Sequence, residues 1–109
     1  MVDDIQLKKI LVCAAKCQRC ASDCLIHRDS KFLMESIQLY IDCSNTCIKA
    51  AQLLKSNYKI GLQYLVLCEE LCCMCDQEGN KHPNIKSCQE CAEECVICAE
   101  VCSQLIMQY

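Results

Sequence analysis

A run of five cysteines in the last quarter of the chain constrains its fold more than any other feature. Cys88, Cys91, Cys95, Cys98 and Cys102 follow one another at alternating steps of three and four residues. This spacing places all five on one face of an α-helix, the face that packs against partners in a bundle. Such a face normally carries Leu, Ile or Val. The sequence therefore predicts a helix whose buried face consists of thiols.

The same three-four alternation recurs in three earlier segments, and only short polar connections separate them. We expect helices over residues 3–27, 31–56, 59–77 and 83–107. Asp29 or Ser30 can cap the second helix, while Gly79 and Pro83 indicate a stop and a restart. Four helices of similar length with short connections predict an all-α, antiparallel up-down-up-down four-helix bundle with a cysteine-lined core. We expect a single domain over residues 1–109.

The composition excludes several classes of protein. The chain has 15 cysteines in 109 residues, only two Gly and one Pro, and a net charge of −3. This charge gives no reason to expect nucleic acid or a membrane as partner, and no stretch approaches the length of a membrane span. The N-terminal stretch lacks the pattern of a signal peptide. We therefore expect a cytoplasmic location, where thiols stay reduced unless they hold metal or perform redox chemistry.

Helical periodicity separates the cysteines into two groups. One group faces inward: Cys13, Cys17, Cys20, Cys24, Cys43, Cys47, Cys68, Cys72, Cys75, Cys88, Cys91, Cys95, Cys98 and Cys102. Cys73 lies about 100° from Cys72 around its helix and falls off this face. Too many cysteines face inward for packing alone to explain them, although a free cysteine can serve as a small hydrophobic residue.

Counting outward from each turn gives the expected levels along the bundle. Cys24, Cys75 and Cys88 should lie near one end, and Cys68 should lie level with Cys17 and Cys20. At the other end an apolar plug is expected from Ile10, Leu54, Ile60, Leu105 and Ile106. The same counting gathers His27, Met34 and His82 at the thiol-rich end, which makes them candidate metal ligands at an entrance.

Thiolates select Cu(I), Zn²⁺ or iron–sulfur clusters. Zinc prefers isolated tetrahedral sites, and the compact spacing of iron–sulfur motifs is missing. Continuous rows of thiols favour many Cu(I) ions, with a zinc or mixed-metal thiolate buffer as the alternative. A thiol redox enzyme would need a βαβ context and a thiol with a lowered pKa at a helix N-terminus. We expect no catalytic residues and no enzyme activity.

The chain resembles the cytosolic copper storage proteins over nearly its whole length. The residues that carry the resemblance are Cys13-x3-Cys17-x2-Cys20-x3-Cys24, Asp42-Cys43-x3-Cys47 with Ala50-Ala51, Cys68-Glu-Glu-Leu-Cys72-x2-Cys75, Gly79-Asn-Lys-His82, and the run from Cys88 to Cys102. The resemblance implies reversible storage or sequestration of multiple Cu(I) ions within each protomer, loading and release at a histidine-containing end, and a homotetramer. It makes a copper chaperone or a low-molecular-weight thiol a candidate partner.

The chain also departs from the family pattern. Family members often have cysteine where this chain has Ser36, Leu65 and Gly79. Fewer thiols near the entrance would reduce copper loading there. Cys73 is an additional thiol, and it is a candidate for a surface thiol, an inter-protomer contact or a late copper ligand.

Overall fold

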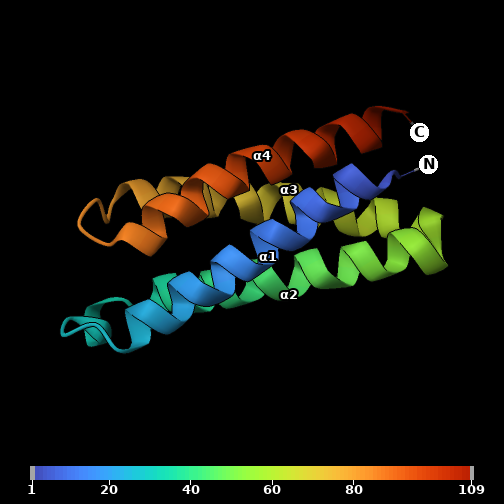
Figure 1. Cartoon of the computed structure of the whole chain (residues 1–109). Helices are drawn as coiled ribbons and strands as arrows, with labels where there is room; N and C mark the ends of the chain where they lie inside the picture. The colour runs from blue at the N-terminus through green and yellow to red at the C-terminus, as the bar shows by residue number, and fades with distance from the viewer. Residues whose placement is uncertain (1, 109) are drawn as a thin grey trace.

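The computed structural model describes residues 2–108 and contains four long helices that run up, down, up and down (Figure 1). Met1 and Tyr109, the ends of the predicted domain, lie outside the described residues. The helices are α1 (Asp4–Leu25), α2 (Met34–Ser56), α3 (Tyr58–Asn80) and α4 (Lys86–Gln108), and a short 3-10 helix, η1 (Ser30–Phe32), precedes α2. The predicted antiparallel four-helix bundle is confirmed.

The bundle is an elongated rod of 44 × 19 × 19 Å. Each of α1 and α3 packs against both α2 and α4. The α1–α2 and α3–α4 connections lie together at one end, while the tight α2–α3 turn lies at the other end with both chain termini (Figure 1). We call the first end the open end and the second the closed end. The four buried helix faces meet along the axis between them.

Side-chain hydrogen bonds fix where two of the helices begin. Asp3 accepts a hydrogen bond from the Gln6 backbone N–H at 2.7 Å, and the Gln6 side chain accepts one from the Asp3 N–H, a capping box that starts α1. The Asn57 side chain accepts from the Ile60 N–H at the start of α3. The expectation that Asp29 or Ser30 caps the second helix is wrong, because η1 intervenes and Leu33 precedes α2 without a side-chain cap.

The boundaries at the open end differ from those expected. Helix α3 does not stop before Gly79 but continues through it to Asn80, and α4 begins at Lys86 rather than at Pro83, which lies in the turn. The reason is packing. A Cβ atom at position 79 would lie only 2.6 Å from the Cys88 backbone oxygen, so this glycine permits close contact between α3 and α4.

The closed end is apolar, although one predicted member of the plug is misplaced. Ile10, Leu54 and Leu105 are buried, and Ile106 is partly buried against them. The inclusion of Ile60 is wrong, because its side chain is 41% exposed. Gly61 faces α2 instead, with its backbone so close to Leu54 that a Cβ would lie 2.7 Å from the Leu54 nitrogen.

Within the described part of the chain, no helix is both long and apolar enough to cross a membrane.

Candidate metal centre

The centre of the bundle is a column of free thiols. Fourteen of the cysteines are fully buried, with side chains at 0% exposure, and Cys73 is exposed. The burial predicted from the three-four spacing is therefore confirmed for every inward-facing cysteine. Their role as ligands stays a prediction.

Three groups of four sulfur atoms occupy the middle of the column. Each group takes one cysteine from each helix, and its sulfur atoms all lie within 4.8 Å of one another. We call these groups the tetrads: Cys17, Cys43, Cys75 and Cys95; Cys13, Cys43, Cys72 and Cys95; and Cys13, Cys47, Cys72 and Cys98. Neighbouring tetrads share two sulfur atoms, so the three form one continuous structure.

Each end of the column has only three sulfurs in its group. Cys20, Cys24 and Cys88 form the entrance trio at the open end, and Cys68, Cys98 and Cys102 form the floor trio toward the closed end. Cys91 borders the first tetrad, because its Sγ lies 3.3 Å from that of Cys17 and 3.8 Å from that of Cys95. The entrance trio contains no cysteine of α2 or α3, and the floor trio contains none of α1 or α2.

Two cysteines lie at other levels than expected. Cys75 belongs to a tetrad with Cys17 and not to the end group of Cys24 and Cys88. Cys68 lies deeper, with its Sγ 3.3 Å from that of Cys47. Both errors have one cause: α3 extends to Asn80, so counting back from a turn at Gly79 shifts its cysteines by about one helical turn.

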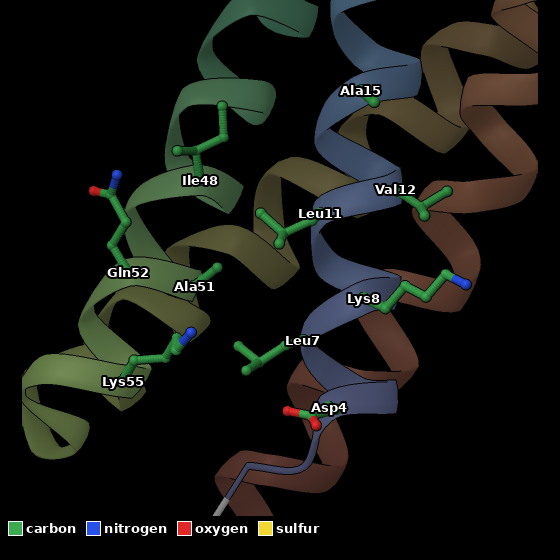
Figure 2. A pocket seen from close by; sticks show the side chains of 10 residues that line it. All are labelled: Asp4, Leu7, Lys8, Leu11, Val12, Ala15, Ile48, Ala51, Gln52 and Lys55. Atoms are coloured by element: carbon green, nitrogen blue, oxygen red, sulfur yellow. The ribbon is translucent and has the colours of Figure 1, made fainter.

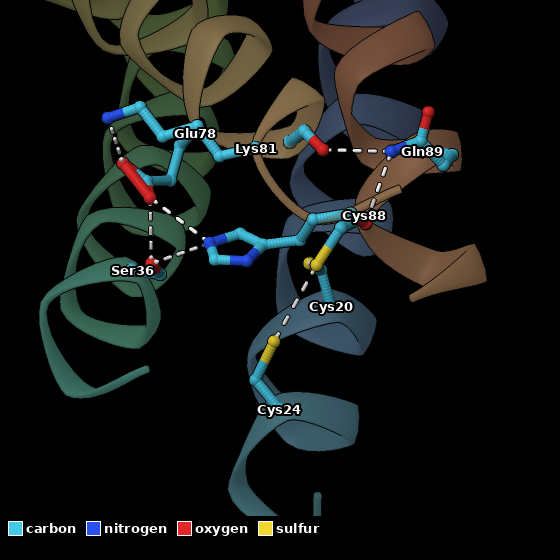
Figure 3. A network of polar contacts seen from close by, with 9 residues as sticks. Cys20, Cys24, Ser36, Glu78, Lys81, Cys88 and Gln89 are labelled. Carbon is cyan, nitrogen blue, oxygen red and sulfur yellow. Dashed lines mark hydrogen bonds and ion pairs between the residues drawn. The ribbon is translucent and has the colours of Figure 1, made fainter. Parts of the chain in front are cut away.

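The thiols of the entrance trio differ in pKa. Cys20 and Cys88 have their Sγ atoms 3.0 Å apart, and Cys24 lies 3.6 Å from Cys88 (Figure 3). The hydrogen bond with Cys20 lowers the pKa of Cys88 to about 6 against the opposing effect of burial, and the nearby Cys24 and His82 lower it further. Burial raises the pKa of Cys24 to about 12. Near neutral pH the trio thus holds one thiolate that its neighbours stabilise.

A network of hydrogen bonds between polar side chains lies at the open end beside this trio. Glu78 accepts a hydrogen bond from the Ser36 hydroxyl at 3.0 Å, and its Oε2 lies 3.2 Å from Nε2 of His82 (Figure 3). Burial opposes ionisation of Glu78, but the contacts with Ser36, His82 and Lys81 outweigh it and lower its pKa. An ionised carboxylate only accepts, so the Nε2–H of His82 donates to Glu78, and Nδ1 is the ring atom on the other side.

The other candidates lie at the same end or on the surface. His27 and His82 line one small cavity of about 170 Å³ with Leu33 and Pro83. Met34 is 55% exposed and lines a neighbouring cavity with Ser36 and His82. The structure therefore gathers His27, Met34 and His82 at the open end as expected, while Cys73 lies on the outer surface of α3.

The sequence matches the profile of the copper storage protein family over residues 4–107. The chain belongs to the copper storage protein family. A cysteine-rich protein of Bacillus subtilis is 29% identical over 93 residues, which cover 85% of each chain.

Solved structures of a copper storage protein from Streptomyces lividans share both the fold and part of the sequence. One is described as a cytosolic copper storage protein loaded with five coppers. It is 27% identical, with a TM-score of 0.86 over 94% of this chain and 89% of the other. A second is loaded with 10 copper equivalents and has a TM-score of 0.88 at 27% identity, covering 95% and 83%.

The sequence reasoning did not assign two residues of the open end to the site. Tyr40 is fully buried on α2, at the end of the bundle where α1 and α4 carry the thiols of the entrance trio. Glu78 contacts His82 four residues later in the chain, and this helical spacing is the sequence signal that could have revealed the pair.

One surface groove lies away from the thiols. A groove of about 560 Å³ runs between α1 and α2 toward the closed end, and Figure 2 shows Leu7 and Leu11 opposite Ile48 along it. Asp4, Lys8 and Lys55 also contribute to its lining. None of its lining residues is a cysteine, so this groove does not belong to the metal centre.

Proposed function

We propose that this member of the copper storage protein family binds and stores or sequesters multiple Cu(I) ions through the thiolates of its core. The observation that carries the proposal is the set of three tetrads, each built from one sulfur of every helix and joined through shared sulfurs. Soft thiolates select Cu(I), and a thiolate shared by two groups can bridge ions. The Streptomyces proteins loaded with five and ten coppers support this reading.

The proposed ligands are the fourteen buried cysteines named above, within a single metal-binding domain. His82 is proposed as a further ligand at the open end, through Nδ1. His27, Met34 and Cys73 are weaker candidates because they are more exposed or lie off the column. The proposal includes no catalytic residue, because the thiols surround one another rather than a space for a substrate.

Uptake and release are proposed to occur at the open end. The closed end is filled by Ile10, Leu54 and Leu105, whereas the open end carries histidines, a thiolate-forming Cys88 and short loops. Each thiol that binds copper must lose its proton, so loading displaces protons to solvent. The ions would then pass inward by exchange between neighbouring sulfurs.

A zinc or mixed-metal thiolate buffer is the alternative. Zinc sites of the structural kind have four ligands of their own at tetrahedral geometry. The tetrads share Cys43 and Cys95 on one side and Cys13 and Cys72 on the other, so adjacent tetrads cannot all be separate zinc sites. This sharing favours Cu(I), which accepts fewer ligands per ion.

The deciding experiment is an anaerobic titration of the fully reduced protein with Cu(I) in the presence of a strong chromogenic chelator, beside a matched titration with Zn²⁺. We expect uptake of many Cu(I) ions per chain before the chelator takes any metal. Saturation at one or two Cu(I) ions would refute storage, and retention of Zn²⁺ equal to or better than that of Cu(I) would favour the buffer.

The finer assignments are proposals too. We propose a cytoplasmic location, self-association into a homotetramer as the resemblance implies, and exchange of copper with a copper chaperone or a low-molecular-weight thiol. The apolar groove between α1 and α2 supports contact with a second copy, because it exposes Leu11 next to half-buried Leu7 and Ile48. Sedimentation equilibrium of the metal-free and loaded protein tests the assembly.

A further inference from the structure

Tyr40 carries a buried hydroxyl group with no partner. Among the described residues it is the largest side chain that is fully buried, and its hydroxyl forms no hydrogen bond of acceptable geometry. Buried polar groups are almost always paired, so an unpaired one calls for an explanation. A phenylalanine would fill the same space without this cost, which suggests that the hydroxyl has a purpose outside the metal-free state.

The position of Tyr40 indicates which group the hydroxyl is placed to meet. On α2 it lies four residues after Ser36 and three before Cys43, on the face that supplies sulfur deeper in the column. Burial raises the pKa of Tyr40, and the adjacent Cys20 and Cys88 raise it further. The placement itself follows from the helix register. Cys43 belongs to the tetrad next to the entrance trio, so Tyr40, one turn nearer the open end on the same buried face of α2, lies level with that trio.

The chemistry of these sulfurs changes when copper binds. A neutral thiol is a weak hydrogen-bond acceptor, whereas a thiolate is charged and accepts strongly, as charge-assisted bonds do. In the metal-free protein the Cys20 thiol donates to Cys88 at 3.0 Å. Copper loading removes the remaining protons of the trio to solvent, so Cys88 loses this donor. The phenol keeps its own proton and can donate in place of Cys20, and no group is oxidised or reduced.

We propose that Tyr40 is a positioning residue for copper in the entrance trio, where its hydroxyl donates a hydrogen bond to the copper-bound thiolate of Cys88 or Cys20. Tyr40 thereby supplies from α2 a contact to the trio that contains no cysteine of that helix. The inference rests on the proposed function, because it requires Cu(I) on these thiolates.

The test is Tyr40→Phe in the full-length protein, with Tyr64→Phe as the matched control. Tyr64 is a half-buried tyrosine on α3, on the closed-end side of Cys68. We expect the metal-free Tyr40→Phe protein to have an unfolding midpoint equal to or above that of the wild type. We also expect the most labile copper to pass to an excess of strong chelator about tenfold faster, while the copper content at saturation stays the same.

A packing role would give a different result. If Tyr40 only fills space, Tyr40→Phe and the wild type should release copper at equal rates, and that outcome overturns the inference. A lower midpoint of the metal-free variant together with faster release from all sites would also overturn it, because the hydroxyl would then support the fold and not the trio.

A double-mutant comparison locates the contact. With Cys88→Ser or Cys20→Ser as background, Tyr40→Phe should lose its effect on release in at least one of the two, and a full effect in both would refute the assignment. Failure of the proposed function is distinguishable, because the wild type itself would then saturate at one or two Cu(I) ions and the inference would fall with it. If the wild type binds many Cu(I) ions but Tyr40→Phe releases copper at the wild-type rate, the inference is refuted and the proposed function stands.

Discussion

Gly79 offers a quantitative test of how α3 and α4 position the entrance trio. A Cβ atom at this position would lie 2.6 Å from the Cys88 backbone oxygen and 2.9 Å from the Ala92 Cβ. Neither atom belongs to a flexible side chain, so α4 itself must move. Overpacking of this kind costs about 3 kcal/mol at the upper end of its usual range. The higher helix propensity of alanine returns about 1 kcal/mol. We therefore expect Gly79→Ala to lower the free energy of unfolding by about 2 kcal/mol.

Urea unfolding of the reduced, metal-free protein, followed by helical circular dichroism, measures this change. For a dependence on urea of about 2 kcal/mol per molar, the midpoint should fall by about 1 M. Gln77→Ala is the control, since Gln77 is exposed on the same helix and its replacement leaves the α3–α4 contact intact. A midpoint of Gly79→Ala above that of the wild type would refute the close contact between α3 and α4 at this position. Only the higher helix propensity of alanine would then act.

The same clash predicts how a cysteine introduced at position 79 would affect copper binding. Gly79→Cys brings the same Cβ atom against the Cys88 carbonyl, so it should disturb the entrance trio rather than extend it. Gln89 strengthens this contact, because its side-chain amide donates to the Gly79 carbonyl at 2.8 Å (Figure 3). In this chain, position 79 is part of the packing between α3 and α4.

Three further results are expected. Glu78→Gln should weaken retention of the most labile copper about tenfold in a chelator competition, because the amide no longer holds His82 in one tautomer. The control Glu70→Gln, at an exposed position of the same helix, should leave retention unchanged. Equal losses in both variants would contradict the pairing of Glu78 with His82. The initial rate of Cu(I) uptake, measured by stopped-flow absorbance, should fall as the pH drops through about 6. The lowered pKa of Cys88 makes this residue a thiolate above that pH and a thiol below it. A rate that stays constant between pH 7.5 and 5 would argue against Cys88 as the first sulfur to bind copper. Ser36→Cys, at a buried position of α2, should raise the copper content at saturation measured by elemental analysis, and an unchanged content would show that the new sulfur does not reach the column.

Helical periodicity was sufficient to predict which thiols are buried. Each inward-facing cysteine lies three or four residues from another on its helix, and burial of all fourteen agrees with that pattern. Cys73 breaks the pattern by one residue and is exposed. A step of one residue turns a side chain by about 100° on a helix, so the prediction depends on local geometry alone.

The levels of the thiols along the axis could not be predicted in this way. They depend on where α3 ends and how far it slides along α4, and the contact of Gly79 with the Cys88 backbone decides both. A glycine before a polar loop usually marks a helix end, and here tertiary packing overrides that signal. Cys75 and Cys68 were misplaced for this reason. Likewise, nothing in the spacing of Tyr40 distinguishes an ordinary core residue from one with an unpaired hydroxyl.

The two ends of the column have fewer thiols than its middle, for different physical reasons. This difference between the ends bears on the direction of copper movement. At the floor, Ile10 and Leu54 occupy the positions of α1 and α2 and exclude both sulfur and water. At the entrance, α2 supplies the Ser36 hydroxyl and the Tyr40 phenol, and α3 supplies the backbone contact of Gly79. Copper that arrives at a trio with fewer sulfurs can gain ligands by moving into a tetrad. Affinity should therefore increase inward from the entrance, so that the entrance trio is the site of exchange and the tetrads are the sites of storage.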